Sequence, residues 1–217
     1  MATPPESINP NATTLPIASD GTVTLVNRST AAIDLILDLQ AYTSAAATGR
    51  VTPVIPVRVL DSRLGTGLAD RKTALAPGET IEVSVGGAAV PLGAEAALLR
   101  VTATEPAAGG FLTVSDSPTP GTSVVNFVVG QSVGNSMTAR LSSAGTVFVT
   151  NNSTGRTHVI LDAAGWMSPT GASLFRSVPQ ARLVDTRIGT VSNSTSTVLQ
   201  AGETRVVKVE RPGSGDF

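Results

Sequence analysis

The chain has 217 residues, and 41% of them are hydrophobic, which is enough apolar material for the core of one large domain or two small ones. Only 14% of the residues are charged and the formal net charge is −1, so the sequence lacks the basic surface that nucleic-acid binding requires. No apolar stretch approaches the roughly 20 residues of a membrane-spanning helix. We expect a folded protein with no nucleic-acid partner and no membrane insertion.

Cysteine is absent, which excludes disulfide bonds and thiolate metal sites. The 21 glycines and 14 prolines punctuate runs rich in Val, Thr, Ile and Leu, a pattern typical of short β-strands joined by tight turns. The predicted fold class is therefore all-β. Residues 1–11 have neither the basic nor the apolar segment of a signal peptide, so in a secreted protein we expect this chain to lie downstream of the signal.

The chain repeats itself without gaps at an offset of 124 residues, as Gly21 and Gly145 illustrate. Near the N-terminus, the residues that recur are Asn11, Gly21, Thr22, Val23, Asn27, Ser29, Thr30, Ile36, Leu37 and Asp38, matched by Asn135, Gly145, Thr146, Val147, Asn151, Ser153, Thr154, Ile160, Leu161 and Asp162. Further along, the residues that recur are Arg58, Asp61, Arg63, Gly65 and Thr66, matched by Arg182, Asp185, Arg187, Gly189 and Thr190. A tandem-repeat protein is predicted.

The repeat predicts one complete unit at residues 53–167. The back part of a unit precedes it in residues 1–45, and the front part of another follows in residues 176–217, with linkers at 46–52 and 168–175. The middle of the unit, residues 94–124, occurs once. One interpretation is a longer tandem array divided out of phase. The other is that the incomplete ends fold against the whole unit or against neighbouring copies, which would produce head-to-tail polymers.

Alternating apolar and polar residues between turn signals predict the strands of the complete unit. In chain order these strands are 57–60, 80–85, 97–104, 110–116, 123–129, 136–141, 146–151 and 158–163. No segment of helical length has a 3.6-residue period. This spacing of short strands favours a β-sandwich, with a closed β-barrel as the alternative.

The run at residues 159–165 is apolar on both faces and predicts a central strand, in which Asp162 is the exception. A buried carboxylate needs a cation or several N–H donors, because an unpaired buried charge costs several kcal/mol. Arg58 and Arg63 are the candidates, since the Arg-x-x-Asp-x-Arg segment recurs with the same period. We hypothesise a structural ion pair between Asp162 and Arg58 or Arg63.

Residues 56–67, PVRVLDSRLGTG, resemble the P-x-R-L-L-D-T-R-x-G-x-G opening of a repeat found in secreted and cell-surface proteins of actinobacteria. The resemblance covers essentially the whole chain and continues to residues 157–166, where the family ends in h-v-v-v-D-v-x-G-Y-F. Trp166 replaces the usual Tyr, and Gln40 and Ala41 stand where the first copy would have Gly before Tyr42. The resemblance implies export and attachment at or beyond the cell wall, often beside hydrolase or adhesive domains, and it implies no reaction.

Groups for catalysis or metal binding are sparse, so we expect no enzyme. The single histidine, His158, is matched by Asp34 in the other copy, which excludes a histidine function common to both copies. No pattern pairs two carboxylates across a cleft. Asp61, Asp162 and the amides of Asn151 and Asn152 are oxygen donors of the kind calcium prefers, but they lack the spacing of a calcium loop. No cofactor is predicted, and calcium is kept as the only metal candidate.

Aromatic residues make up 3% of the chain, and Trp166, Tyr42 and Phe111 are the candidates for stacking against a ligand, although each also suits core packing. We predict a non-catalytic extracellular structural or adhesive repeat module at the cell surface. One alternative is a glycan- or cell-wall-binding accessory module of a larger secreted enzyme. Another is a subunit of a self-assembling extracellular filament or particle. The expected partners are neighbouring repeat units, other copies of the chain, and cell-wall or host glycans.

Overall fold

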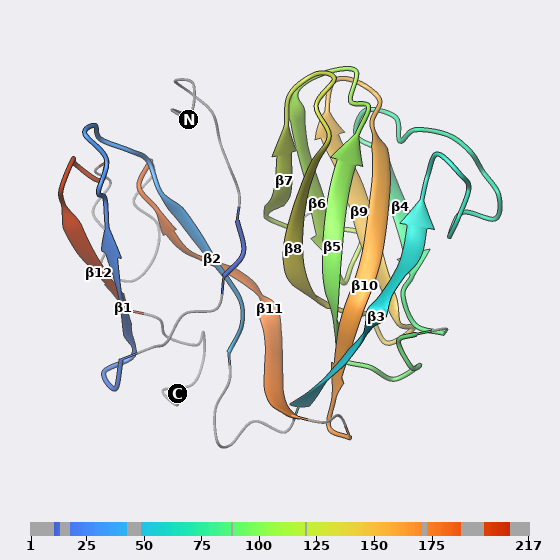
Figure 1. The fold of residues 1–217 in the computed structure, drawn as a ribbon, viewed down its shortest axis with the longest axis horizontal. Helices are drawn as coiled ribbons and strands as arrows, with labels where there is room; N and C mark the ends of the chain where they lie inside the picture. The colour runs from blue at the N-terminus through green and yellow to red at the C-terminus, as the bar shows by residue number, and fades with distance from the viewer. Residues whose placement is uncertain are drawn as a thin grey trace. The chain divides into compact units, whose positions relative to one another are not determined.

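The computed structural model describes residues 11–13, 18–42, 49–87, 89–119, 121–170, 173–187 and 198–208. All regular secondary structure in these ranges is β-strand, and the strands pair antiparallel (Figure 1). The predicted all-β class is confirmed. Within the same ranges, no helix is long and apolar enough to cross a membrane.

The chain divides into two compact units. The first comprises residues 1–12 and 40–179, and so contains the complete repeat. The second comprises residues 13–39 and 180–217, and so combines segments from the two partial repeats. Segments from the two incomplete ends of the chain therefore lie in one compact unit.

The first unit is a sandwich of two open antiparallel sheets. The first sheet has the order β3 (Gly49–Asp61), β10 (His158–Ser168), β5 (Ala96–Thr104) and β8 (Val133–Arg140), and the start of β11 (Ser173–Asp185) pairs with β3. The second sheet has the order β4 (Thr80–Ser84), β9 (Thr146–Ser153), β6 (Gly110–Ser115) and β7 (Ser123–Phe127). Each predicted strand has a counterpart here, and neither sheet closes on itself, so the sandwich is the correct alternative to the barrel.

Several strands extend beyond the bounds that the sequence predicted, and β11 was not among the predicted strands. β10 continues to Ser168, and β3 and β11 begin at Gly49 and Ser173, within the segments expected to be linkers. Residues 169–170 lie in a turn, and residues 46–48 and 171–172 of those segments lie outside the described residues. The extra residues of β3 pair with the end of β10, so cross-strand partners extend the strands beyond the local alternation.

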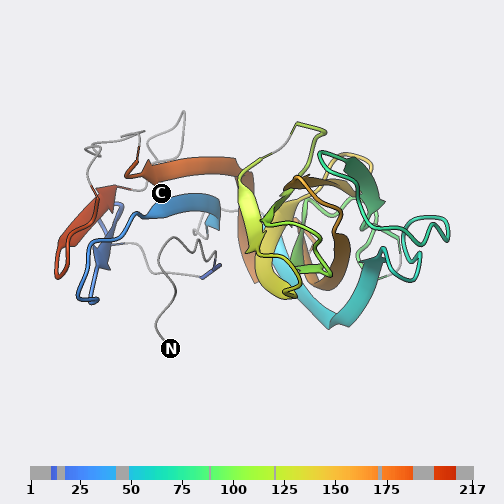
Figure 2. The same ribbon diagram turned by 90° about the horizontal axis from the view of Figure 1, so that it is seen from above.

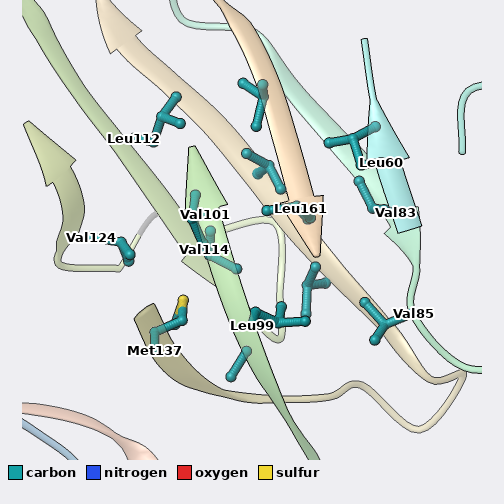
Figure 3. Close-up of a cluster of buried hydrophobic side chains, with 14 of the residues drawn as sticks. Leu60, Val83, Val85, Leu99, Val101, Leu112, Val114, Val124, Met137 and Leu161 are labelled. Atoms are coloured by element: carbon teal, nitrogen blue, oxygen red, sulfur yellow. The ribbon is translucent and has the colours of Figure 1, made fainter. Parts of the chain in front are cut away.

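The core of the first unit lies between the two sheets (Figure 3). Leu161 of β10 pairs with Leu60 on one side and Val101 on the other, and all three side chains are fully buried. The facing sheet supplies buried side chains that include Leu112 and Val114. Because successive strand residues point to opposite faces, one face of each sheet is apolar and packs against the other sheet.

The second unit repeats the pairing of the first with segments from opposite ends of the chain. β1 (Thr22–Val26) pairs with β12 (Thr204–Lys208), so the blue and red strands of Figure 1 lie side by side, as they do in Figure 2. Val26 faces Thr204, which is the 124-residue equivalent of Thr150 facing Thr80 in β9 and β4. β2 (Ile36–Tyr42) pairs with β11. The pair β1–β12 therefore has the same register as the pair β9–β4, although the strands of the two pairs are connected differently along the chain.

We predict that Leu161→Ala lowers the stability of the first unit by about 2–5 kcal/mol, because it leaves a cavity between two fully buried neighbours. Trp166, the only tryptophan, lies on the same strand and reports unfolding in urea by its fluorescence. Leu92→Ala is the control, because that side chain is 75% exposed. A Leu161→Ala transition at the midpoint of the unchanged protein would contradict this description of the core.

Candidate functional site

The side chains that recur between the copies gather where β3 ends and the next turn begins. The Asp61 amide donates to the Thr66 carbonyl, and the Gly65 amide returns to the Asp61 carbonyl. Gly65 and Gly67 both have positive φ, and a side chain at position 67 would collide with the Val59 carbonyl oxygen. The two glycines that follow the Arg-x-x-Asp-x-Arg segment therefore permit a tight turn that returns to the end of its own strand.

Asp61 is a fully buried carboxylate held between two arginines. Its Oδ1 accepts hydrogen bonds from Arg63 Nε at 3.0 Å and from the Arg63 amide at 3.1 Å. Its Oδ2 accepts from Arg63 Nη2 at 2.8 Å and from Arg58 Nη1 at 3.0 Å. The hydrogen bonds from the Arg63 side chain are the main reason that the pKa of Asp61 is lowered to about 2, against the opposing effect of burial. We call Asp61 with Arg58 and Arg63 the clasp.

Arg58 links the clasp to the neighbouring strand. Its Nε lies 2.9 Å from Asp162 Oδ1, while its Nη1 reaches Asp61. The structure therefore brings Arg58 and Asp162 together, whereas Arg63 binds Asp61. The hydrogen bond to Asp162 is the largest cause of the raised pKa of Arg58.

The expectation that Asp162 is a buried carboxylate is wrong, because its side chain remains 24% exposed. Leu161 and Ala163 are fully buried, and strand alternation turns Asp162 to the other face. The fully buried carboxylate is that of Asp61. It is therefore Asp61 that requires a cation or N–H donors to offset the cost of burying its charge.

The same arrangement occurs in the second unit. Asp185 Oδ1 accepts from Arg187 Nε at 2.9 Å, and Oδ2 accepts from Arg187 Nη2 at 2.7 Å. The Asp185 side chain is also fully buried. The hydrogen bond that Arg187 donates to that carboxylate raises the pKa of Arg187, as the hydrogen bond to Asp61 does for Arg63. The contact between Asp61 and Arg63 in the first unit is therefore repeated between Asp185 and Arg187 in the second unit.

Ser62 and His158 approach each other closely, which raises the question of a catalytic pair. Ser62 Oγ lies 2.9 Å from His158 Nδ1, but it also accepts the Val159 amide at 2.9 Å, and Ser62 is fully buried. In the second unit Thr186 takes the place of Ser62: its hydroxyl accepts the Leu35 amide and donates to Asp34. The hydroxyl is retained and the imidazole is not, so the geometry supports a strand-to-strand contact and not a reactive serine.

Asn151 is a second recurring contact, and the sequence assigned it only the role of a possible calcium donor. Its Nδ2 lies within 3.1 Å of three carbonyl oxygens, while its Oδ1 accepts from Ser153 Oγ at 2.7 Å. The equivalent Asn27 repeats the pattern with Ala31, Leu199, Gln200 and Ser29. The recurrence of asparagine at the 124-residue offset was the signal that could have revealed this role.

The oxygen donors considered for calcium are already engaged. Both oxygens of Asp61 accept from guanidinium groups, Asp162 pairs with Arg58, and Asn152 Nδ2 donates to Thr113 and to the Thr150 carbonyl. In the part of the chain that the structure describes, no three His, Cys, Asp or Glu residues form a group able to hold a metal. The geometry gives these residues no calcium site.

The three candidate aromatic residues do not share a groove. Tyr42 is 6% exposed, and Trp166 on β10 packs against the core of the first unit. Phe111 lies on β6 of the other sheet and is 38% exposed. Phe111 is therefore the most exposed of the three.

No protein-family model, curated protein or solved structure matches this chain. The resemblance to the actinobacterial repeat stays a prediction, and the function is argued from the geometry.

We predict that the clasp stabilises the folded state by an amount that depends on pH. Because the folded-state pKa of Asp61 is about 2 and the ordinary value is 3.8, the ionised carboxylate favours the folded state. Its contribution, about 2 kcal/mol, is present above pH 4 and is lost as the pH falls towards 2. Urea unfolding followed by Trp166 fluorescence at pH 7, 4 and 2.5 measures this dependence.

Asp61→Asn is expected to lower stability at pH 7 and to remove this part of the acid dependence. Asp162→Asn is expected to cost less, about 1 kcal/mol or below, because its ion pair is partly exposed to water. Asp70→Asn, in the exposed turn that follows, is the control. If Asp61→Asn retained the acid dependence of the unchanged protein, the clasp would not be its origin.

Proposed function

We propose that the chain is a non-catalytic structural or adhesive module, built from tandem β-sandwich repeats and carried at the extracellular surface of the cell. The observation that carries this proposal is the kind of contact that recurs. Asp61 and Asp185, Ser62 and Thr186, and Asn151 and Asn27 all connect strand to strand or strand to turn. The one potentially reactive side chain among them, His158, is replaced by Asp34. The side chains that recur between the copies are therefore those that hold the strands and turns together.

Such a scaffold suits spacing and display. With no cysteine and a net charge of −1, each unit depends on packing and on internal ion pairs, and it presents a nearly neutral surface. The pairing between segments of different repeats in β1 and β12 supplies a route by which neighbouring units can be joined. The cell-surface location is supported by the resemblance at residues 56–67 and 157–166.

An antibody raised against the 217-residue chain tests the location. We expect it to label intact cells of the source organism, and brief treatment of those cells with an external protease to remove the signal. An antibody against a cytoplasmic enzyme serves as the control for cell integrity. Labelling that appears only after lysis would contradict the surface assignment.

A glycan-binding accessory module is the second candidate, and Phe111 is the observation that favours it. Its exposed ring lies between Asn126 of β7 and Asn152 of β9 on the outer face of the second sheet. A ring flanked by two amides offers a stacking surface and hydrogen-bonding groups to a sugar. This candidate depends on Phe111 alone, because Tyr42 and Trp166, the other two candidates for stacking, are less exposed.

If this second candidate holds, the chain sediments with isolated cell walls and Phe111→Ala lowers the bound fraction about tenfold, as expected for a lost stacking contact. Leu92→Ala is the matched control, because it also shortens an exposed apolar side chain. Equal retention of the two variants would rule out the Phe111 face as the binding surface.

A further inference from the structure

The outer face of the second sheet carries two aromatic side chains, one of which the sequence analysis did not single out. Phe111 of β6 is followed by Leu112, which is fully buried. Phe148 of β9 lies between Val147 and Val149, which are also fully buried. Because side chains alternate along a strand, both rings point away from the core. Phe111 is 38% exposed, and Phe148 is partly exposed.

The two rings lie on neighbouring strands at a separation that the register defines. Phe111 is directly opposite Asn152, and Asn152 is four residues along β9 from Phe148. At the usual rise along a strand, four residues place the two positions about 14 Å apart along the strand direction. This distance exceeds the width of one sugar ring. A glycan that contacts both rings must therefore be a chain of several sugars.

The side chains between the two rings are short and already hydrogen-bonded to each other. Thr113 of β6 is paired with Thr150 of β9, and these residues are only 1% and 3% exposed. Thr150 Oγ1 lies 2.8 Å from Thr80 Oγ1, and Asn152 Nδ2 donates to Thr113 Oγ1 at 3.2 Å. The rings are therefore more exposed than the surface between them.

Polar groups that can bind a ligand lie on both sides of the more exposed ring. Asn126 of β7 and Asn152 of β9 are the two residues opposite Phe111. In the part of the chain that the structure describes, the Asn126 side chain makes no hydrogen bond, and Asn152 uses only its Nδ2. A whole amide and a second carbonyl oxygen are therefore available to hydrogen-bond with sugar hydroxyls beside Phe111.

The second sheet is almost free of charge, unlike the first. Glu82 is the only charged residue in strands β4, β9, β6 and β7, and Thr146 Oγ1 donates to its carboxylate at 2.8 Å. The first sheet instead has Arg58, Asp162 and Arg100 in one row across its strands. Because the strands of the second sheet supply no cation, they do not attract an anionic polymer, and their chemistry matches an uncharged ligand.

From these observations we propose that Phe111 and Phe148 are two stacking positions of one binding site for an uncharged, linear glycan that lies along the strands of the second sheet. Each ring stacks on a different sugar of the chain, while Asn126 and Asn152 bind hydroxyl groups beside Phe111. This inference rests on the second candidate function, the glycan-binding accessory module. It adds the class of ligand, the direction of the ligand on the sheet and a second contact residue.

Titration calorimetry of the complete 217-residue chain tests the class of ligand. The uncharged probes are linear oligosaccharides of glucose, galactose, mannose and N-acetylglucosamine, each in lengths from disaccharide to octasaccharide. Oligogalacturonates of the same lengths are the charged counterparts. We expect at least one uncharged series to bind, with an affinity that rises once the chain is long enough to reach both rings. Binding to none of the uncharged series, or tighter binding of the oligogalacturonates, would overturn the proposal.

Substitutions of the two rings test the two stacking positions. Phe148→Leu is expected to weaken binding of the octasaccharide about tenfold and to leave the shortest oligosaccharide that binds unaffected, whereas Phe111→Leu weakens both. Phe148→Tyr is the matched control, because it keeps the ring and is expected to bind like the unchanged chain. Urea unfolding followed by Trp166 fluorescence verifies that each variant is folded under the conditions of the titration.

The inference and the candidate function on which it rests fail on different results. If Phe111→Leu lost affinity and Phe148→Leu did not, the glycan-binding candidate would stand and the second stacking position would be wrong. If neither variant lost affinity, both would be wrong. Equal losses in Phe148→Leu and Phe148→Tyr would also overturn the proposal, since the aromatic ring would then not be the group that the glycan contacts.

Discussion

A β-sheet with one apolar face is stable only when that face is covered, and this constraint governs both units of the chain. In the first unit, β10 lies between β3 and β5, and Leu161 is buried because both neighbours and the facing sheet are present. In the second unit, within the residues that the structure describes, the equivalent strand β2 pairs only with β11, and Leu37 remains partly exposed. The difference between the two units follows from which faces are covered.

The polar contacts that recur have a different role: they give hydrogen-bond partners to buried polar groups where strands end. Asp61 places a charge in a fully buried position, and two guanidinium groups and a backbone amide compensate for it. The Asn151 side-chain amide donates hydrogen bonds to the carbonyl oxygens of Leu75 and Gly155, which lie outside the strands. Because such contacts are costly to break singly, they specify the turns of the unit more sharply than apolar packing alone.

These contacts also explain why the chain resembles a scaffold. Ser62 and His158 have the separation of a reactive pair, yet the serine hydroxyl is buried and accepts a backbone amide, and the other copy uses Thr186 with Asp34. The repeat preserves the hydroxyl, the carboxylate of the clasp and the asparagine amide. A structural function is compatible with this selection of side chains.

The sequence by itself determined the strands and the repeat, because alternation, turn residues and the 124-residue offset are local or directly countable properties. It also identified the segment that holds the clasp, but it assigned the buried charge to Asp162. Burial depends on which face of a strand meets the other sheet, and only the tertiary structure decided that Asp61 is enclosed while Asp162 stays at the surface. The pairing of β1 with β12 was likewise decided by tertiary structure, because it joins segments from the two ends of the chain.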